Sequence, residues 1–270
     1  MILLSIAISV ALVVTIALPV AAGIWLNKKW HIPWRVITYG AMAYFIVQAL
    51  MAFLSSGFAG LVDNGTLALS DQAYLILQLI ISVVFIALLG VLIRWAGMKF
   101  IKEPLVSLEA AYAIGLGYGG IESLIGVGLP LLMTFISMLS NTNIDPQTTS
   151  LAPEVVSQLE ALWQIQPVVP LAGSLERIAA LVMHITVTVL ILQAFIRKNN
   201  AWLAAAFGLE LLINGMILGL AEIGLAYGWV ILIAVILMVG NLYLLYRLQA
   251  FDVKVPKMVD ETPQDDLLSS

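Results

Sequence analysis

Long apolar runs separated by short polar connections make up most of this chain. Each of the seven longest runs has at least the roughly 18 residues that an α-helix needs to cross the hydrocarbon core of a bilayer. They cover Ile2–Leu26, Trp34–Leu54, Asp71–Trp95, Leu105–Gly128, Val168–Phe195, Ala201–Leu225 and Trp229–Tyr246. The pattern predicts an all-α, polytopic membrane helix bundle with seven transmembrane helices, which together form one domain of residues 1–248.

The fourth run continues as apolar sequence to Leu139, which is too long for one straight crossing. We expect this helix to be broken near Gly126–Pro130, because glycine and proline interrupt helices. In the following loop, residues 140–167, Pro153 is placed to begin a short amphipathic helix at the outer membrane surface. Residues 249–270 are polar and predict a disordered cytoplasmic tail.

Lysine and arginine are confined to alternate connections between the predicted helices. They comprise Lys28, Lys29 and Arg35 after the first helix, Arg94, Lys99 and Lys102 after the third, Arg197 and Lys198 after the fifth, and Arg247, Lys254 and Lys257 after the seventh. Because basic connections stay in the cytoplasm, the arrangement predicts an outer N-terminus and a cytoplasmic C-terminus in a multi-pass protein of the cell membrane. Only Arg177 departs from this arrangement, since it lies inside a predicted helix.

The composition agrees with a membrane protein and excludes several kinds of site. Hydrophobic residues make up 62% of the chain and charged residues 10%, whereas about a quarter of a soluble domain is charged. The acidic pI of about 5.1 argues against nucleic acid as a partner. The chain contains no cysteine, which excludes disulfides, a thiol nucleophile and any cysteine-ligated metal.

Three of the predicted helices carry ionisable residues within the membrane. The fourth contains Glu122, the fifth contains Glu176, Arg177 and His184, and the sixth contains Glu210 with Asn214 one turn later. Each charged group at mid-bilayer costs roughly 2.5–3.5 kcal/mol, so we expect these side chains to converge, with Arg177 bridging at least one carboxylate. They form either a structural ion-pair cluster or the lining of a functional cavity. The three acids and the histidine favour the cavity.

A glycine-rich segment, Gly115-Leu-Gly117-Tyr118-Gly119-Gly120, precedes Glu122. Although it contains the pattern GxGxxG, no strand precedes it, so a dinucleotide site is not supported. Gly115 and Gly119 also form a GxxxG pattern, which lets the backbone of a neighbouring helix approach closely. We therefore expect this segment to bring Glu122 next to another helix.

The residues within the membrane suit some hydrolytic mechanisms better than others. The predicted helices hold no pair of buried aspartates for an aspartyl protease, and the chain has no HExxH zinc motif. A serine nucleophile paired with His184 is a weaker alternative. Glu122, Glu176 and His184 can instead activate water directly, while His184 and Asn214 donate hydrogen bonds to the developing oxyanion.

The order of these motifs resembles the YhfC family of glutamic-type intramembrane peptidases, which is related to CAAX-processing, bacteriocin-processing and PrsW-type membrane proteases. The similarity covers about Ile2–Gln249 and is strongest in the segments GLGYGGIES (115–123) and SLERIAALVMH (174–184). The resemblance implies a membrane-buried glutamate that activates water for peptide-bond hydrolysis. It implies catalytic roles for Glu122, Glu176 and His184, and supporting roles for Arg177, Glu210, Asn214 and Tyr118.

The chain departs from the family pattern at two positions. The family often has a histidine where this chain has Tyr118, and its third motif is typically His-x-x-x-Asp, where this chain has Glu210-Leu-Leu-Ile-Asn214. We therefore expect no cofactor, with zinc as the less favoured alternative, and a peptidase that has lost its activity is a variant of the same interpretation. The expected partners are membrane lipid and a transmembrane or membrane-proximal protein substrate.

Two functions of other classes stay open. A non-catalytic scaffold would grip a partner helix, for which the GxxxG pattern is suited. A proton-coupled transporter would use the buried carboxylates, although such proteins are commonly built from internal repeats and this chain has no evident repeat.

Overall fold

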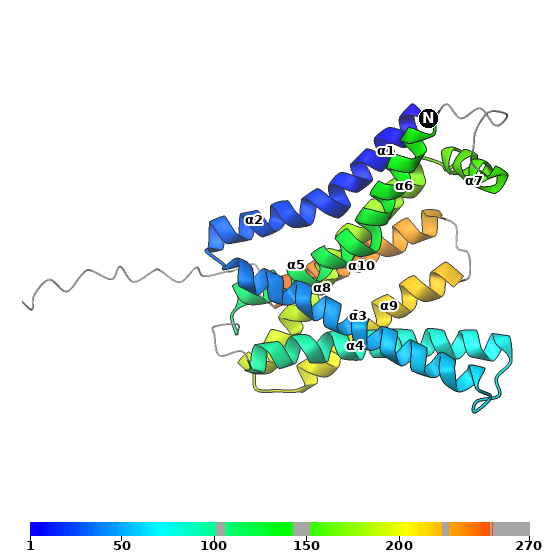
Figure 1. The fold of residues 1–270 in the computed structure, drawn as a ribbon. Helices are drawn as coiled ribbons and strands as arrows, with labels where there is room; N and C mark the ends of the chain where they lie inside the picture. The colour runs from blue at the N-terminus through cyan, green and yellow to red at the C-terminus, as the bar shows by residue number, and fades with distance from the viewer. Residues whose placement is uncertain (101–105, 143–151, 223–226, 249, 251–270) are drawn as a thin grey trace, which may run out of the picture.

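The computed structural model describes residues 1–100, 106–142, 152–222, 227–248 and 250, and every secondary-structure element in this part of the chain is helical (Figure 1). The elements are α1 (Ile2–Leu12), the π-helical segment η1 (Val13–Ala17), α2 (Leu18–Trp30), α3 (Trp34–Asp63), α4 (Asp71–Phe100), α5 (Leu108–Glu122), the π-helical segment η2 (Ser123–Gly128), α6 (Leu129–Ser140), α7 (Pro153–Trp163), α8 (Val168–Ile196), α9 (Ala201–Glu222) and α10 (Tyr227–Arg247). The predicted all-α fold is confirmed.

Five helical stretches of the described chain are long and apolar enough to cross a membrane. They are Ile2–Trp30, Trp34–Asp63, Asp71–Phe100, Leu108–Ser140 and Val168–Ile196. The helices α9 and α10 contain the shorter apolar stretches Ala201–Met216 and Ile231–Arg247. The structure thus agrees with a multi-pass bundle, while the count of seven spans and their orientation stay predictions.

Local sequence signals set where several helices begin and end. The helix α2 ends at His31, whose φ of 55° lies in the left-handed region that commonly closes a helix. Pro33 then directly precedes α3, as expected for a residue that cannot continue the preceding helix. The helix α5 begins after Ser107, whose hydroxyl oxygen accepts a hydrogen bond from the Ala110 backbone N–H at 3.2 Å.

The fourth predicted helix is irregular near the expected break but does not stop there. The chain stays helical from Leu108 to Ser140, and residues Ser123–Gly128 form the π-helical segment η2. A π-helical turn widens the helix locally and is frequent at functional sites. A second π-helical segment, η1, packs against η2, and the Ser123 hydroxyl donates a hydrogen bond to the Thr15 carbonyl oxygen at 3.1 Å. The irregularity therefore follows directly after Glu122.

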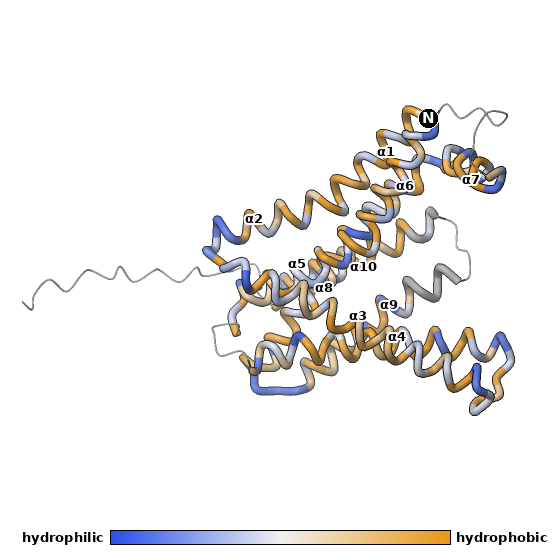
Figure 2. Tube along the Cα trace, in the orientation of Figure 1, coloured by the Kyte–Doolittle hydropathy of each residue, from blue (hydrophilic) through white to orange (hydrophobic). Residues whose placement is uncertain are grey.

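The helix α8 is the core of the bundle. It packs against α1, α4, α5, α9 and α10, and most of its residues from Ala179 to Ala194 are buried. The helices are hydrophobic along most of their lengths, and hydrophilic residues concentrate at their ends and in the connections (Figure 2). The outer faces of α1, α3 and α4 expose many large apolar side chains, Phe53 and Leu75 among them. This is the surface expected of a protein surrounded by lipid.

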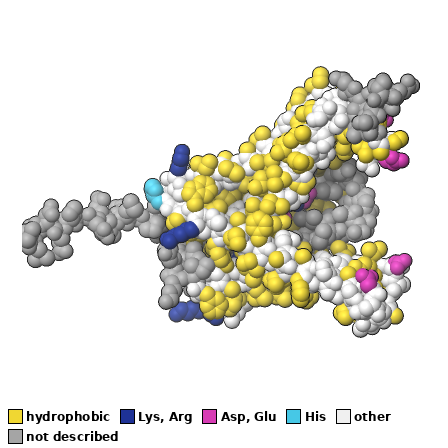
Figure 3. Space-filling model, in the orientation of Figure 1, with side chains coloured by type: hydrophobic (Ala, Val, Ile, Leu, Met, Phe, Trp, Pro, Cys, Tyr) yellow, Lys and Arg dark blue, Asp and Glu magenta, His cyan; other side chains and the backbone are white. Residues whose placement is uncertain are grey.

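Charged side chains separate towards the two ends of the molecule. On the face shown in Figure 3, Lys and Arg gather at the end where α2 and α4 finish, and most Asp and Glu lie at the opposite end. Lys28, Lys29 and Lys99 are in the last turns of α2 and α4, while Asp71 and Glu154 are in the first turns of α4 and α7. The gathering of Lys and Arg at one end is consistent with the predicted topology, whose orientation stays a prediction.

The remaining predicted regions are only partly described. The helix α7 begins at Pro153, and its Leu162 and Trp163 pack on the cluster of Leu4, Ile8 and Met138 beside α6. The predicted tail lies outside the described residues except for Ala250, whose carbonyl oxygen accepts a hydrogen bond from the Tyr112 hydroxyl at 3.0 Å. The division into a membrane domain and a disordered tail stays a prediction.

Candidate active site

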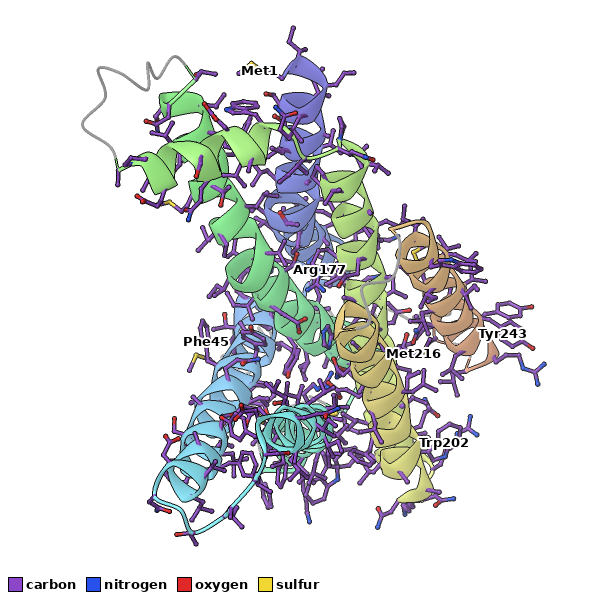
Figure 4. All side chains as sticks on the ribbon, turned by 90° about the vertical axis from the view of Figure 1, so that its right-hand side faces the viewer. Met1, Phe45, Arg177, Trp202, Met216 and Tyr243 are labelled. Atoms are coloured by element: carbon purple, nitrogen blue, oxygen red, sulfur yellow. The ribbon has the colours of Figure 1, made fainter. Side chains whose placement is uncertain are left out.

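Arg177 on α8 joins two glutamates from two helices. Its guanidinium forms an ion pair with the neighbouring Glu176, and Nη1 lies 3.3 Å from Oε1 of Glu122, the last residue of α5. Figure 4 shows Arg177 between α8 and the continuous α5–α6 helix. The Arg177 side chain is 12% exposed and both carboxylates are 27% exposed. Both carboxylates are thus held in place by Arg177 and are not fully buried.

His184 lies beside the other oxygen of Glu122. The distance from Nε2 of His184 to Oε2 of Glu122 is 2.9 Å, which is a hydrogen-bonding distance, although the ring is not aligned for a hydrogen bond. The Nδ1 atom of His184 is buried and has no hydrogen-bond partner among the described residues. Catalytic hydrogen bonds are often poorly aligned before substrate binds. The two side chains are therefore close enough to form a hydrogen bond once the ring is aligned.

Glycines of α5 allow this contact between α5 and α8. A Cβ atom at Gly115 would lie 2.6 Å from Cα of Ile185, and one at Gly119 would lie 2.8 Å from Cδ2 of His184. Larger residues at either position would push the two helices apart. The same segment packs closely on α3 as well, because a Cβ at Gly117 would meet the Ile37 carbonyl oxygen at 2.0 Å. The glycines bring Glu122 next to His184.

A second, fully buried cluster lies one turn further along α8. Arg94 of α4 forms an ion pair with Glu210 of α9, and their side chains are 0% and 1% exposed. The Nε atom of Arg94 donates to the Gly90 carbonyl oxygen at 2.7 Å, and its Nη1 donates to the Thr188 hydroxyl at 3.3 Å. A Cβ atom at Gly90 would lie 2.8 Å from Oε1 of Glu210, so the absence of a side chain there leaves room for the ion pair.

This cluster corrects the assignment of Arg94 to a cytoplasmic connection. Arg94 is six residues before the end of α4 and is buried between helices, so it is not one of the loop charges. Arg94 is also a second arginine among these buried acids, whereas the sequence suggested that Arg177 alone faces the three glutamates. The signal that could have identified it is its place within the apolar run that ends at Trp95.

Tyr118 connects the two clusters. Its ring centroid lies 4.5 Å from Cζ of Arg94 and 4.9 Å from the centroid of the His184 ring. A third aromatic ring, that of Tyr44 on α3, meets Tyr118 edge-on at 5.5 Å. Tyr118 is 1% exposed. The polar residues of α4, α5, α8 and α9 therefore form one continuous network.

Asn214 is less closely connected to this network. Its Nδ2 atom is buried and has no hydrogen-bond partner in the described part of the chain. No hydrogen bond between described residues joins it to Glu122 or His184. Its amide is available as a donor one turn beyond Glu210.

A pocket of about 150 Å³ lies between α2, α3 and α5. Its lining is apolar and includes Ile37, Gly117 and Ile121, which immediately precedes Glu122. None of the ionisable residues of the site lines this pocket. The pocket therefore adjoins the site without containing its polar groups.

Comparison with known proteins identifies the family of this chain. A family model described as "YhfC intramembrane metalloprotease" matches residues 14–239. The chain belongs to the YhfC family. It is thus a multi-pass membrane protein from a family of intramembrane proteases, as the sequence motifs indicated. No curated protein and no solved structure matches the chain.

The description of the YhfC family as metalloproteases implies a metal, for which zinc is the usual ion. Catalytic zinc takes three protein ligands. In the described residues, no group of three or more His, Cys, Asp or Glu side chains is arranged to hold a metal ion. His184 and Glu122 provide two adjacent donors, while Glu176 and Glu210 are each paired with an arginine. The residues present do not fit a catalytic zinc site.

Proposed function

We propose that this member of the YhfC family is a glutamic-type intramembrane peptidase, in which Glu122 activates water for peptide-bond hydrolysis. The single observation that carries the proposal is the 2.9 Å contact between Glu122 and His184, on a carboxylate that remains 27% exposed. Glu210, by comparison, has a fully buried side chain whose Oε2 is paired with Arg94 and whose Oε1 has no hydrogen-bond partner among the described residues. The substrate class is a transmembrane or membrane-proximal polypeptide.

The reaction needs a base, a proton donor and a donor to the oxyanion. Glu122 takes a proton from water, and the water oxygen attacks the carbonyl carbon of the scissile bond. When the tetrahedral intermediate collapses, the C–N bond breaks and the proton held by Glu122 passes to the leaving amine. His184, beside Glu122, donates to the developing oxyanion.

Arg177 and Glu176 act on Glu122 in this proposal. Arg177 contacts Oε1 of Glu122 through Nη1, which leaves Oε2 on the side of His184. Glu176 in turn holds the guanidinium in place. The base therefore has one oxygen fixed by a charge-assisted contact and the other directed to the reacting groups.

The proposal can be tested with purified protein in proteoliposomes. Wild-type protein, Glu122→Gln and Glu109→Gln would be incubated with a library of membrane-spanning peptides, and the products identified by mass spectrometry. Glu109 is in the first turn of the same helix α5 and serves as the matched control. We expect cleavage by the wild type and by Glu109→Gln, and none by Glu122→Gln. Equal cleavage by Glu122→Gln would contradict the assignment of the base.

A further inference from the structure

We propose that the guanidinium of Arg94 is the resident cation at the centre of this bundle, that it replaces a divalent metal there, and that it positions His184 against Glu122. The first two parts of this proposal go beyond the proposed function and do not depend on it. The positioning of His184 acquires a catalytic meaning only if the proposed function holds. The replacement of the metal and the positioning of His184 can both be tested without measuring cleavage.

The surroundings of Arg94 are those of a cation-binding site that is already filled. The guanidinium lies among oxygen acceptors from three helices: the Glu210 carboxylate on α9, the Gly90 carbonyl on α4 and the Thr188 hydroxyl on α8. The face of the Tyr118 ring lies 4.5 Å from Cζ, as in a cation–π contact. The guanidinium is itself a cation, and its planar fork of N–H donors suits such a set of oxygen acceptors.

A metal ion would have to compete with this charge. Glu210, the only acid paired with Arg94 among the described residues, is neutralised by it, and a divalent cation beside the guanidinium would be repelled in surroundings of low dielectric constant. The imidazole of His184 contacts the Tyr118 ring, which also packs on the guanidinium. A metal ion at Glu210 would therefore have to displace the guanidinium that already contacts Oε2 of this carboxylate.

Arg94 also supports His184 from two directions. The Nη1 atom of Arg94 lies 3.5 Å from the His184 carbonyl oxygen, which additionally accepts a hydrogen bond from the Thr188 hydroxyl at 2.7 Å. The Tyr118 ring, packed on the guanidinium, contacts the imidazole at a centroid distance of 4.9 Å. Backbone and side chain of His184 are thus both placed by groups that Arg94 holds. Arg94 is therefore a positioning residue and not a catalytic one.

The histidine content of the chain makes this proposal accessible to ¹⁵N NMR. The chain contains two histidines, His31 at the end of α2 and His184 in the core, so protein labelled with ¹⁵N-histidine reports on the site with an internal control. Metal-free protein in detergent would be titrated with Zn²⁺ to equimolar concentration. We expect the ring nitrogen signals of His184 not to move. A change at His31 alone would be surface binding and agrees with the proposal.

The same spectra test whether Arg94 positions the His184 ring. Arg94→Met combined with Glu210→Met removes both charges together, which avoids leaving one buried charge unpaired and favours a folded protein. We expect this double variant to shift the His184 ring signals while those of His31 stay in place. Arg197→Met is the matched control, because Arg197 pairs with Gln193 and Trp202 at the far end of α8. It should leave the His184 signals unchanged.

Two results would overturn the proposal. Zn²⁺ that shifts the His184 nitrogens of the wild type in a 1:1 ratio would show that a metal binds there despite Arg94. His184 signals in the Arg94→Met/Glu210→Met variant that coincide with those of the wild type would show that Arg94 does not position the imidazole. Because neither result depends on peptide cleavage, failure of this proposal and failure of the proposed function are distinguishable.

Discussion

Arg94 and Glu210, which are 116 residues apart in the chain, form an ion pair in which neither side chain is more than 1% exposed. The pair joins α4 to α9 and lies next to the Tyr118 ring that contacts His184. A polar network inside the bundle therefore links the helices that frame the site.

Removing one member of the buried pair should cost more than removing both. Arg94→Met leaves the Glu210 carboxylate without a counterion, and such losses typically destabilise a protein by about 3–5 kcal/mol. The double variant Arg94→Met/Glu210→Met buries no charge at these positions, so its free energy of unfolding should be close to that of the wild type. The free energies of unfolding of the wild type, the two single variants and the double variant form a double-mutant cycle, which unfolding in denaturing detergent, followed by circular dichroism, measures. Destabilisations that simply add would contradict a specific pair.

The contact between α5 and α8 should be sensitive to a single methyl group. At Gly115 a Cβ atom would meet the Ile185 backbone at 2.6 Å, and overpacking of this kind costs about 1–3 kcal/mol. We expect Gly115→Ala to be destabilised and to lose activity, because the added methyl group pushes α5 away from α8 and separates Glu122 from His184. Gly208→Ala is the control, since no atom lies within 4 Å of its Cβ position. Equal unfolding midpoints for the two variants would refute the close approach.

Arg177 should affect the reaction more than the fold. Its side chain is partly exposed, so Arg177→Gln need not unfold the protein, but Glu122 then loses the contact that fixes Oε1. Misplacement of a reacting group by about 1 Å can cost on the order of 100-fold in rate. We expect a loss of about this size in kcat, measured on a cleaved peptide from the library. An unchanged kcat would mean that Arg177 does not position the base.

The absence of cysteine allows the membrane orientation to be measured directly. Thr66 lies in the exposed connection between α3 and α4, and His31 lies in that between α2 and α3. A membrane-impermeant maleimide should label Thr66→Cys on intact cells and His31→Cys only after the cells are opened. Labelling in the reverse pattern would invert the predicted topology.

The sequence predicted the helices well because their apolar runs are long. The predicted fifth span ended at Phe195 and α8 ends at Ile196. Differences arise where polarity changes within a helix: α3 continues past Leu54 to Asp63, since small polar residues and glycine lower the hydropathy without ending a helix. The π-helical segments η1 and η2 depend on packing between distant parts of the chain, which periodicity does not encode.

The sequence predicted that the candidate site residues converge, but it did not predict all of their partners. Glu122, Glu176 and His184 are conspicuous as ionisable residues in apolar sequence, and the structure brings all three to Arg177 or to each other. Arg94 was missed because an arginine near the end of an apolar run is expected at the cytoplasmic surface. Only the contact with Glu210, from a helix far away in the sequence, shows that it is buried.

Cleavage after removal of metals tests most directly whether Glu122 activates water without a metal ion. Wild-type protein in proteoliposomes would be treated with a strong chelator, checked for residual zinc by elemental analysis, and offered a peptide that the untreated protein cleaves. We expect the cleavage rate to be retained after chelation and lost in Glu122→Gln. Loss of cleavage on chelation, with recovery on addition of Zn²⁺, would contradict it.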